Sequence, residues 1–209
     1  MSQEDDRRPL ASRDTGWARG IAAALARSAV TPNQISVASV LFAAAGAASL
    51  AFWPSLAGLL LTALCIQLRL LCNLFDGMVA IEGGKQSAVG ALYNEFPDRI
   101  ADSVLIIALG YACQQPWLGW LGALAAALTA YIRQTGAGLG FGHDFRGPMA
   151  KQQRMFVLTL GCILGAVELC WDGGQRLLLT AAVVIAAGSV LTCITRTRAL
   201  AARLREAAQ

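Results

Sequence analysis

Apolar runs of about 20 residues recur along almost the whole chain, and this is the length that an α-helix needs to cross the hydrocarbon core of a bilayer. Of the 209 residues, 56% are hydrophobic and only 14% are charged, which is too little charge to cover the surface of a water-soluble domain. No water-soluble stretch of domain size remains between the runs. The pattern therefore predicts an all-α, polytopic membrane protein.

The runs predict six transmembrane helices that form one domain over 31–195. The expected spans are 31–53, 55–81, 87–113, 117–138, 150–170 and 175–195. Residues 1–30 are predicted to be a cytosolic leader ending in an amphipathic helix, for which a place in the membrane interface and a place in water are both open. Residues 196–209 are predicted to be a charged cytosolic tail that forms a helix emerging into water. The polar N-terminus does not look like a cleavable signal peptide.

Basic residues gather on alternate connections between the expected spans. The N-terminal segment, the loop around Lys85, the 133–154 segment and the tail hold nearly all of them, while the other turns hold only Arg176. Positive charge accumulates on the cytoplasmic side of inner membranes. We therefore expect a multi-pass protein of a bacterial-type inner membrane, with both termini and the basic loops in the cytosol.

The second and third spans carry polar side chains within apolar sequence. Ionisable groups are costly at membrane depth, so they usually face a bundle interior or a wet cavity and mark a functional site. Asn73 and Asp76 are three residues apart and Asn94 and Asp98 four, so each pair lies on one face of its helix. Their oxygen atoms would suit Mg²⁺ or Mn²⁺ near the cytosolic surface. The alternative is that buried polar contacts only hold the helices together.

The stretch 73–98 resembles the signature of the CDP-alcohol phosphotransferase family, D-x2-D-G-x2-A-R followed by G-x3-D-x3-D. Five residues match it in identity and order, namely Asp76, Gly77, Ala80, Gly90 and Asp98. Asn73 and Asn94 stand where the signature has aspartate, and Ile81 stands where it has arginine. Two carboxylates remain instead of four. Glu95 and Asp102 share a helix stripe with Asp98 and are candidates to replace the lost charge.

The resemblance implies a metal-dependent enzyme of phospholipid biosynthesis that transfers a phosphatidyl-type group from a CDP-linked lipid to an alcohol and releases CMP. It implies Mg²⁺ or Mn²⁺ held by Asn73, Asp76, Asn94 and Asp98, with Asp98 also the general base. It places the CDP group at Asn33, Asp76, Gly77, Ala80 and Gly90. The expected partners are the CDP-linked lipid, the alcohol, membrane lipids and a second copy of the chain in a homodimer, with no nucleic acid.

A second basic cluster follows the fourth span and is expected to bind the acceptor, including a phosphorylated one. Its members are Tyr131, Arg133, Arg146, Lys151 and Arg154. The equal alternative is positive-inside topology with attraction to anionic headgroups. Two other function classes stay open. One is a non-catalytic lipid-binding or scaffold protein with this fold. The other, a small secondary transporter, is disfavoured because the polar residues lie near one face and no repeat is seen.

Overall fold

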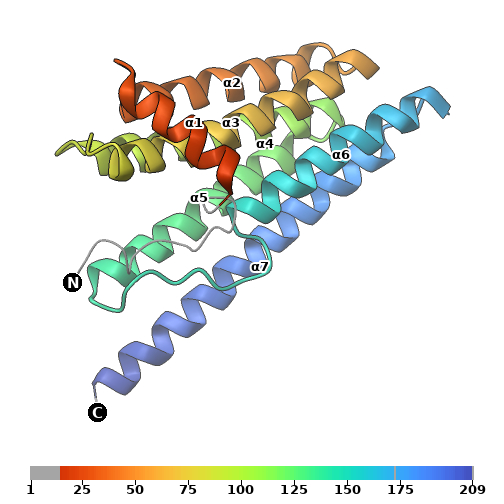
Figure 1. Cartoon of the computed structure of the whole chain (residues 1–209). Helices are drawn as coiled ribbons and strands as arrows, with labels where there is room; N and C mark the ends of the chain where they lie inside the picture. The colour runs from red at the N-terminus through yellow and green to blue at the C-terminus, as the bar shows by residue number, and fades with distance from the viewer. Residues whose placement is uncertain (1–14, 172, 209) are drawn as a thin grey trace.

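The computed structural model describes residues 15–171 and 173–208, and this part of the chain folds into seven α-helices without a strand (Figure 1). The helices are α1 Gly16–Arg27, α2 Pro32–Phe52, α3 Leu56–Glu82, α4 Gly90–Ala112, α5 Pro116–Gly138, α6 Lys151–Trp171 and α7 Arg176–Ala207. The all-α prediction is confirmed. The first 14 residues of the predicted leader lie outside the described residues.

The helix starts follow from capping chemistry that is visible in the sequence. At α2, the Gln34 backbone N–H donates to the Thr31 hydroxyl at 3.3 Å, and the Thr31 N–H donates to the Gln34 side chain at 3.0 Å. This reciprocal pair is a capping box. Pro32 fits in the first turn, where a missing N–H costs nothing. At α3, Ser55 caps the helix by accepting from the Gly58 N–H at 3.2 Å.

In the bundle, α2 packs against both α3 and α4. α5 lies between α4 and α7, and α6 lies against α3 and α7. Small residues allow close approach. A Cβ on Gly110 would lie 2.6 Å from the Gly119 backbone, so α4 and α5 touch there backbone to backbone. By contrast, α3 and α4 are bridged largely by polar side chains. The contact between α3 and α4 is therefore a polar one.

α1 is an amphipathic helix that packs on α3 and crosses the bundle in Figure 1. Ala18 and Ala22 are buried against Phe75 and its neighbours. The Trp17 ring meets the Phe75 ring edge-on, with 6.2 Å between centroids, while the rest of Trp17 is half exposed. Part of the apolar face of the predicted leader helix is thus buried against α3.

Four of the described helices, α2, α3, α6 and α7, are long and apolar enough to cross a membrane. α4 and α5 are each 23 residues long, which is also spanning length, but neither meets that criterion, and α4 carries Glu95, Asp98, Arg99 and Asp102. The six predicted spans therefore match six long helices, of which four meet the criterion of length and composition. The chain is a multi-pass membrane protein, and α7 continues without a break through 196–207.

Candidate active site

A cavity of about 420 Å³ opens where the start of α2, the end of α3 and the start of α4 meet. Its lining residues are Pro32, Asn33, Ser36, Asp76, Gly77, Ala80, Ile81, Lys85, Gln86, Ser87, Ala88, Gly90, Ala91 and Asn94. All five residues that the resemblance assigns to the CDP group are among them. The structure therefore gathers these predicted residues from three helices into one hollow.

Asp76 lies on the wall of this cavity with only 5% of its surface exposed. The Ser36 hydroxyl on α2 donates to Asp76 Oδ2 at 2.7 Å and fixes the carboxylate from the opposite helix. Among the described residues, no lysine or arginine forms an ion pair with Asp76. Asp76 therefore presents to the cavity a carboxylate that has no ion-pair partner among the described residues.

Asp98 lies in a second polar group, which does not line the cavity. The Asn73 amide donates to Asp98 Oδ1 at 2.7 Å, and the Arg69 guanidinium donates to the same oxygen at 3.4 Å. Lys151 donates to Asp98 Oδ2, and Arg99 lies 3.8 Å from that oxygen. The four predicted metal ligands are therefore divided between Asp76 and Asn94 at the cavity and Asn73 and Asp98 beside it.

Asp102 occupies the buried centre of an ion-pair network between α3, α4 and α6. Arg69 donates to Asp102 Oδ1 at 2.6 Å, and Arg154 donates to Asp102 Oδ2 at 2.9 Å. All three side chains are almost completely buried. Asp102, a candidate metal ligand, and Arg154, a candidate acceptor residue, thus hold three helices together in this structure. Glu95, the other candidate ligand, accepts from Arg133 at 2.6 Å.

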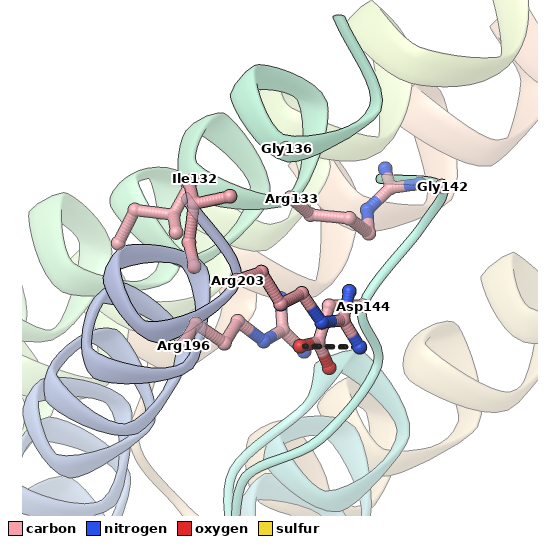
Figure 2. Close-up of a pocket in the computed structure, with 8 residues that line it drawn as sticks. Ile132, Arg133, Gly136, Gly142, Asp144, Arg196 and Arg203 are labelled. Atoms are coloured by element: carbon pink, nitrogen blue, oxygen red, sulfur yellow. Dashed lines mark ion pairs between the residues drawn. The ribbon is translucent and has the colours of Figure 1, made fainter. Parts of the chain in front are cut away.

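A smaller cavity, of about 10 Å³, lies between the end of α5, the 139–150 connection and the last turns of α7. It is lined by Ile132, Arg133, Gly136, Gly142, Asp144, Arg196, Leu200 and Arg203. Figure 2 shows Arg196 and Arg203 extending from α7 toward Asp144, with the Arg203–Asp144 ion pair at 3.9 Å. We call this hollow the arginine cavity. Of the predicted acceptor residues, only Arg133 lines it.

Arg196 and Arg203 were missed because the sequence places them in a charged tail. Arg196 donates to the Thr129 carbonyl at 2.7 Å and to the Arg146 carbonyl at 2.9 Å, so its guanidinium is held in place. The signal that could have found them is their spacing of seven residues, which is two helical turns and puts both on one face. The sequence predicts a helix here, but it gives no sign that this helix packs against the rest of the bundle.

A divalent cation has few acidic ligands to choose from in this chain. Among the described residues, no group of three His, Cys, Asp or Glu side chains converges as a metal site. Asp76 shares its cavity with the amides of Asn33 and Asn94, whose carbonyl oxygens are suitable ligands for Mg²⁺ or Mn²⁺. One carboxylate with two amide oxygens is a set of donors whose chemistry suits one hard cation.

The helices and the two cavities define a multi-pass membrane protein with a charged site at one end of its bundle. No protein-family model matches the chain. Archaetidylinositol phosphate synthase of Aeropyrum pernix is 30% identical over 138 residues, which are 66% of this chain and 69% of that one. The chain belongs to the CDP-alcohol phosphotransferase family, as the resemblance over 73–98 predicts. It is accordingly an enzyme that transfers a substituted phosphate group to an alcohol.

Solved structures show the same fold. The phosphatidylinositol phosphate synthase of Mycobacterium tuberculosis with CDP-DAG bound superposes with a TM-score of 0.71 at 19% identity, covering 88% of this chain and 92% of that one. The same protein in complex with manganese and citrate gives a TM-score of 0.72 at 20% identity, covering 88% of each chain. The bundle is thus shared although most side chains differ.

Proposed function

We propose that the protein transfers the phosphatidyl-type group of a CDP-linked lipid to a phosphorylated polyol and releases CMP. The observation that carries this proposal is the 420 Å³ cavity, which collects every residue assigned to the CDP group. The arginines of the small arginine cavity support an anionic acceptor, which would enter only by displacing Asp144. The relatives support the acceptor class, because they are synthases of inositol phosphate lipids. A non-catalytic lipid-binding protein is the competing function.

The donor would enter the large cavity with its diphosphate against backbone that carries no Cβ. Gly77 and Gly90 line this wall. Lys85 is the only described lining residue with a positive charge. Its ammonium donates to the Ser28 carbonyl at 2.6 Å and to the Val30 carbonyl at 3.1 Å, which leaves its third hydrogen for a ligand. The signature has arginine at the position of Ile81, and Lys85 lies four residues after it. We assign to Lys85 the positive charge that this arginine would supply.

Replacing Lys85 by methionine is therefore expected to raise the KM for the CDP-linked lipid about tenfold, since a hydrogen bond to a charged group is worth about 1.5–3 kcal/mol. The acceptor KM should change much less. Steady-state CMP release at varied donor and varied acceptor separates the two. Arg198→Met, which removes an exposed positive charge from α7, is the matched control. Equal changes in both KM values would contradict the assignment.

The catalytic chemistry would be divided between the two polar groups. Asp76, with the carbonyl oxygens of Asn33 and Asn94, would hold Mg²⁺ or Mn²⁺. When bound, such an ion neutralises the diphosphate and the charge that develops on the departing CMP. The Asp98 carboxylate would accept the proton of the attacking hydroxyl. Asn73 would orient Asp98 through its 2.7 Å hydrogen bond.

The acceptor phosphate would be bound by Arg133, Arg196 and Arg203. Arginine offers planar, bidentate donors that match phosphate geometry. Asp144 now occupies this anionic position: it contacts Arg146 at 2.8 Å and Arg203 at 3.9 Å. An incoming phosphate would take the place of this carboxylate at the cavity arginines.

Arg133→Ala should raise the acceptor KM about tenfold and leave the donor KM nearly unchanged, because one charge-assisted contact to the acceptor is lost. The same pair of titrations measures it. Should the donor KM rise as much as the acceptor KM, Arg133 serves topology or headgroup binding instead of the acceptor.

The proposed function is tested with purified protein, radiolabelled CDP-diacylglycerol, Mn²⁺ or Mg²⁺, and a panel of inositol phosphate, glycerol phosphate, inositol and serine. CMP release with a phosphorylated member and not with its unphosphorylated counterpart is the expected result. An absence of CMP release with every acceptor favours the non-catalytic alternative. Release with an unphosphorylated alcohol alone would keep the transferase and overturn the acceptor class.

We also propose a bacterial-type inner-membrane location with the site facing the cytosol, and a homodimer. The orientation is supported by the basic residues at the site end of the bundle, among them Arg133, Lys151 and Arg203. Labelling of single cysteines from either side of the membrane tests the orientation, and mass measurement in detergent tests the dimer.

A further inference from the structure

We propose that Lys151 is a built-in cation for Asp98, and that the chain consequently holds a single divalent ion, on Asp76. This inference rests on the proposed function and narrows its metal requirement. It assigns different roles to Asp76 and Asp98, which in the family signature belong to one set of metal ligands. It makes Lys151 a positioning residue for Asp98 instead of a surface charge.

The hydrogen-bonding capacity of Asp98 is nearly filled by the protein itself. An ionised carboxylate offers about four acceptor positions. Oδ1 accepts from Asn73 at 2.7 Å and from Arg69 at 3.4 Å, and Oδ2 accepts from Lys151 while Arg99 lies 3.8 Å away. Only 13% of the Asp98 side chain is exposed. A metal ion could bind Asp98 only by displacing these donors and by approaching three positive charges.

Lys151 is held at this place by the structure around it. It is the first residue of α6. Just before it, the Met149 N–H donates to the Thr192 hydroxyl at 2.9 Å, and the Met149 carbonyl accepts from Arg154 at 2.9 Å. Arg154 in turn is anchored on buried Asp102. The start of α6 is therefore fixed from both sides, and the ammonium of Lys151 is directed at Asp98.

Asp76 is in the opposite situation. Ser36, a neutral hydroxyl, is the side chain that donates to it, while the cations at the start of α6 and on α3, Lys151, Arg154 and Arg69, pair with Asp98 or Asp102. Asn94, in the same cavity, adds a neutral oxygen ligand. A divalent ion near Asp76 meets one free carboxylate, whereas near Asp98 it meets a carboxylate that is already compensated. The loss of two signature carboxylates, at Asn73 and Asn94, removes two negative charges, which is the charge that one divalent ion would neutralise.

The test is a Mn²⁺ titration of the full-length protein in detergent, without substrate, read by calorimetry and by the loss of the free Mn²⁺ EPR signal. The wild type should bind one ion per chain, Asp76→Asn none, and Asp98→Asn still one. Lys151→Met should expose Asp98 and either add a second ion or tighten binding at least tenfold. Lys151→Arg should behave as the wild type, and Arg198→Met is the charge-matched control.

Two ions per wild-type chain, no bound ion at all, or loss of the ion in Asp98→Asn would overturn the inference. A Lys151→Met protein that stays folded by thermal unfolding and binds Mn²⁺ as the wild type does would overturn the role of Lys151. These outcomes are independent of turnover. If the chain binds one ion on Asp76 but releases CMP with no acceptor, the proposed function is contradicted and this inference is not.

Discussion

Asp76→Asn is expected to lower the rate of CMP release by roughly 10³-fold, the upper range for removing one group that stabilises developing charge. Asp76 is the one carboxylate on the wall of the large cavity, since the other described lining residues are neutral apart from Lys85. Its replacement leaves the cavity without negative charge to hold a dication. The measurement is single-turnover CMP release from labelled donor at saturating acceptor.

Ser36→Ala is the matched control for this variant. It removes the 2.7 Å hydrogen bond to Asp76 but keeps the charge, so the rate should fall far less. Thermal unfolding in detergent should show that both variants remain folded, because no ion pair to Asp76 is lost. Turnover of Asp76→Asn within tenfold of the wild type would place the reacting phosphate elsewhere.

Asp102→Ala is expected to reduce the free energy of unfolding by about 3–5 kcal/mol, because removing one partner of a buried ion pair leaves uncompensated charge. Here two arginines, Arg69 and Arg154, would lose their common carboxylate. Both are buried, with guanidinium nitrogens that already lack other partners. Reversible denaturant titration in mixed micelles measures the loss.

Asp144→Asn provides the comparison, since it also removes a carboxylate that contacts two arginines. Its ion pairs are partly exposed, with the Arg146 side chain 49% accessible, so its cost should stay within about 1 kcal/mol. Asp102→Ala should leave the Mn²⁺ titration of the folded protein unchanged. A weakened titration without a loss of stability would instead make Asp102 a metal ligand.

The helices could be predicted closely from the sequence because their limits depend on local chemistry. A bilayer-length apolar run, Pro32 after a threonine cap and the Ser55 cap each set a boundary within a residue or two of the observed one. The end of α7 was the exception. Its last turns carry arginines that look like a tail, and only tertiary contacts such as Arg196 with the Thr129 carbonyl show them to be part of the bundle.

The site could be predicted in part. Helix periodicity predicts one helix face for Asn73 and Asp76, and the family resemblance selects five residues that line one cavity. Periodicity cannot tell which partner each side chain faces. Asn73 turns to Asp98, and Asp102 turns to two arginines from distant helices. Those choices depend on how α3, α4 and α6 pack, which is a property of the whole bundle.

The length of α7 has a consequence for how two unlike substrates meet. Its 32 residues extend about 48 Å at 1.5 Å per residue, whereas the hydrocarbon core is about 30 Å thick. The first 20 residues suffice to cross, so in the proposed orientation Arg196 and Arg203 would stand at the level of the headgroups and water. In the proposed reaction a soluble phosphate ester would reach these arginines without entering the hydrocarbon core. The lipid donor would diffuse laterally to the site with its acyl chains still in the leaflet. The reaction would thus take place at the boundary between the two phases, and neither substrate would have to leave its own.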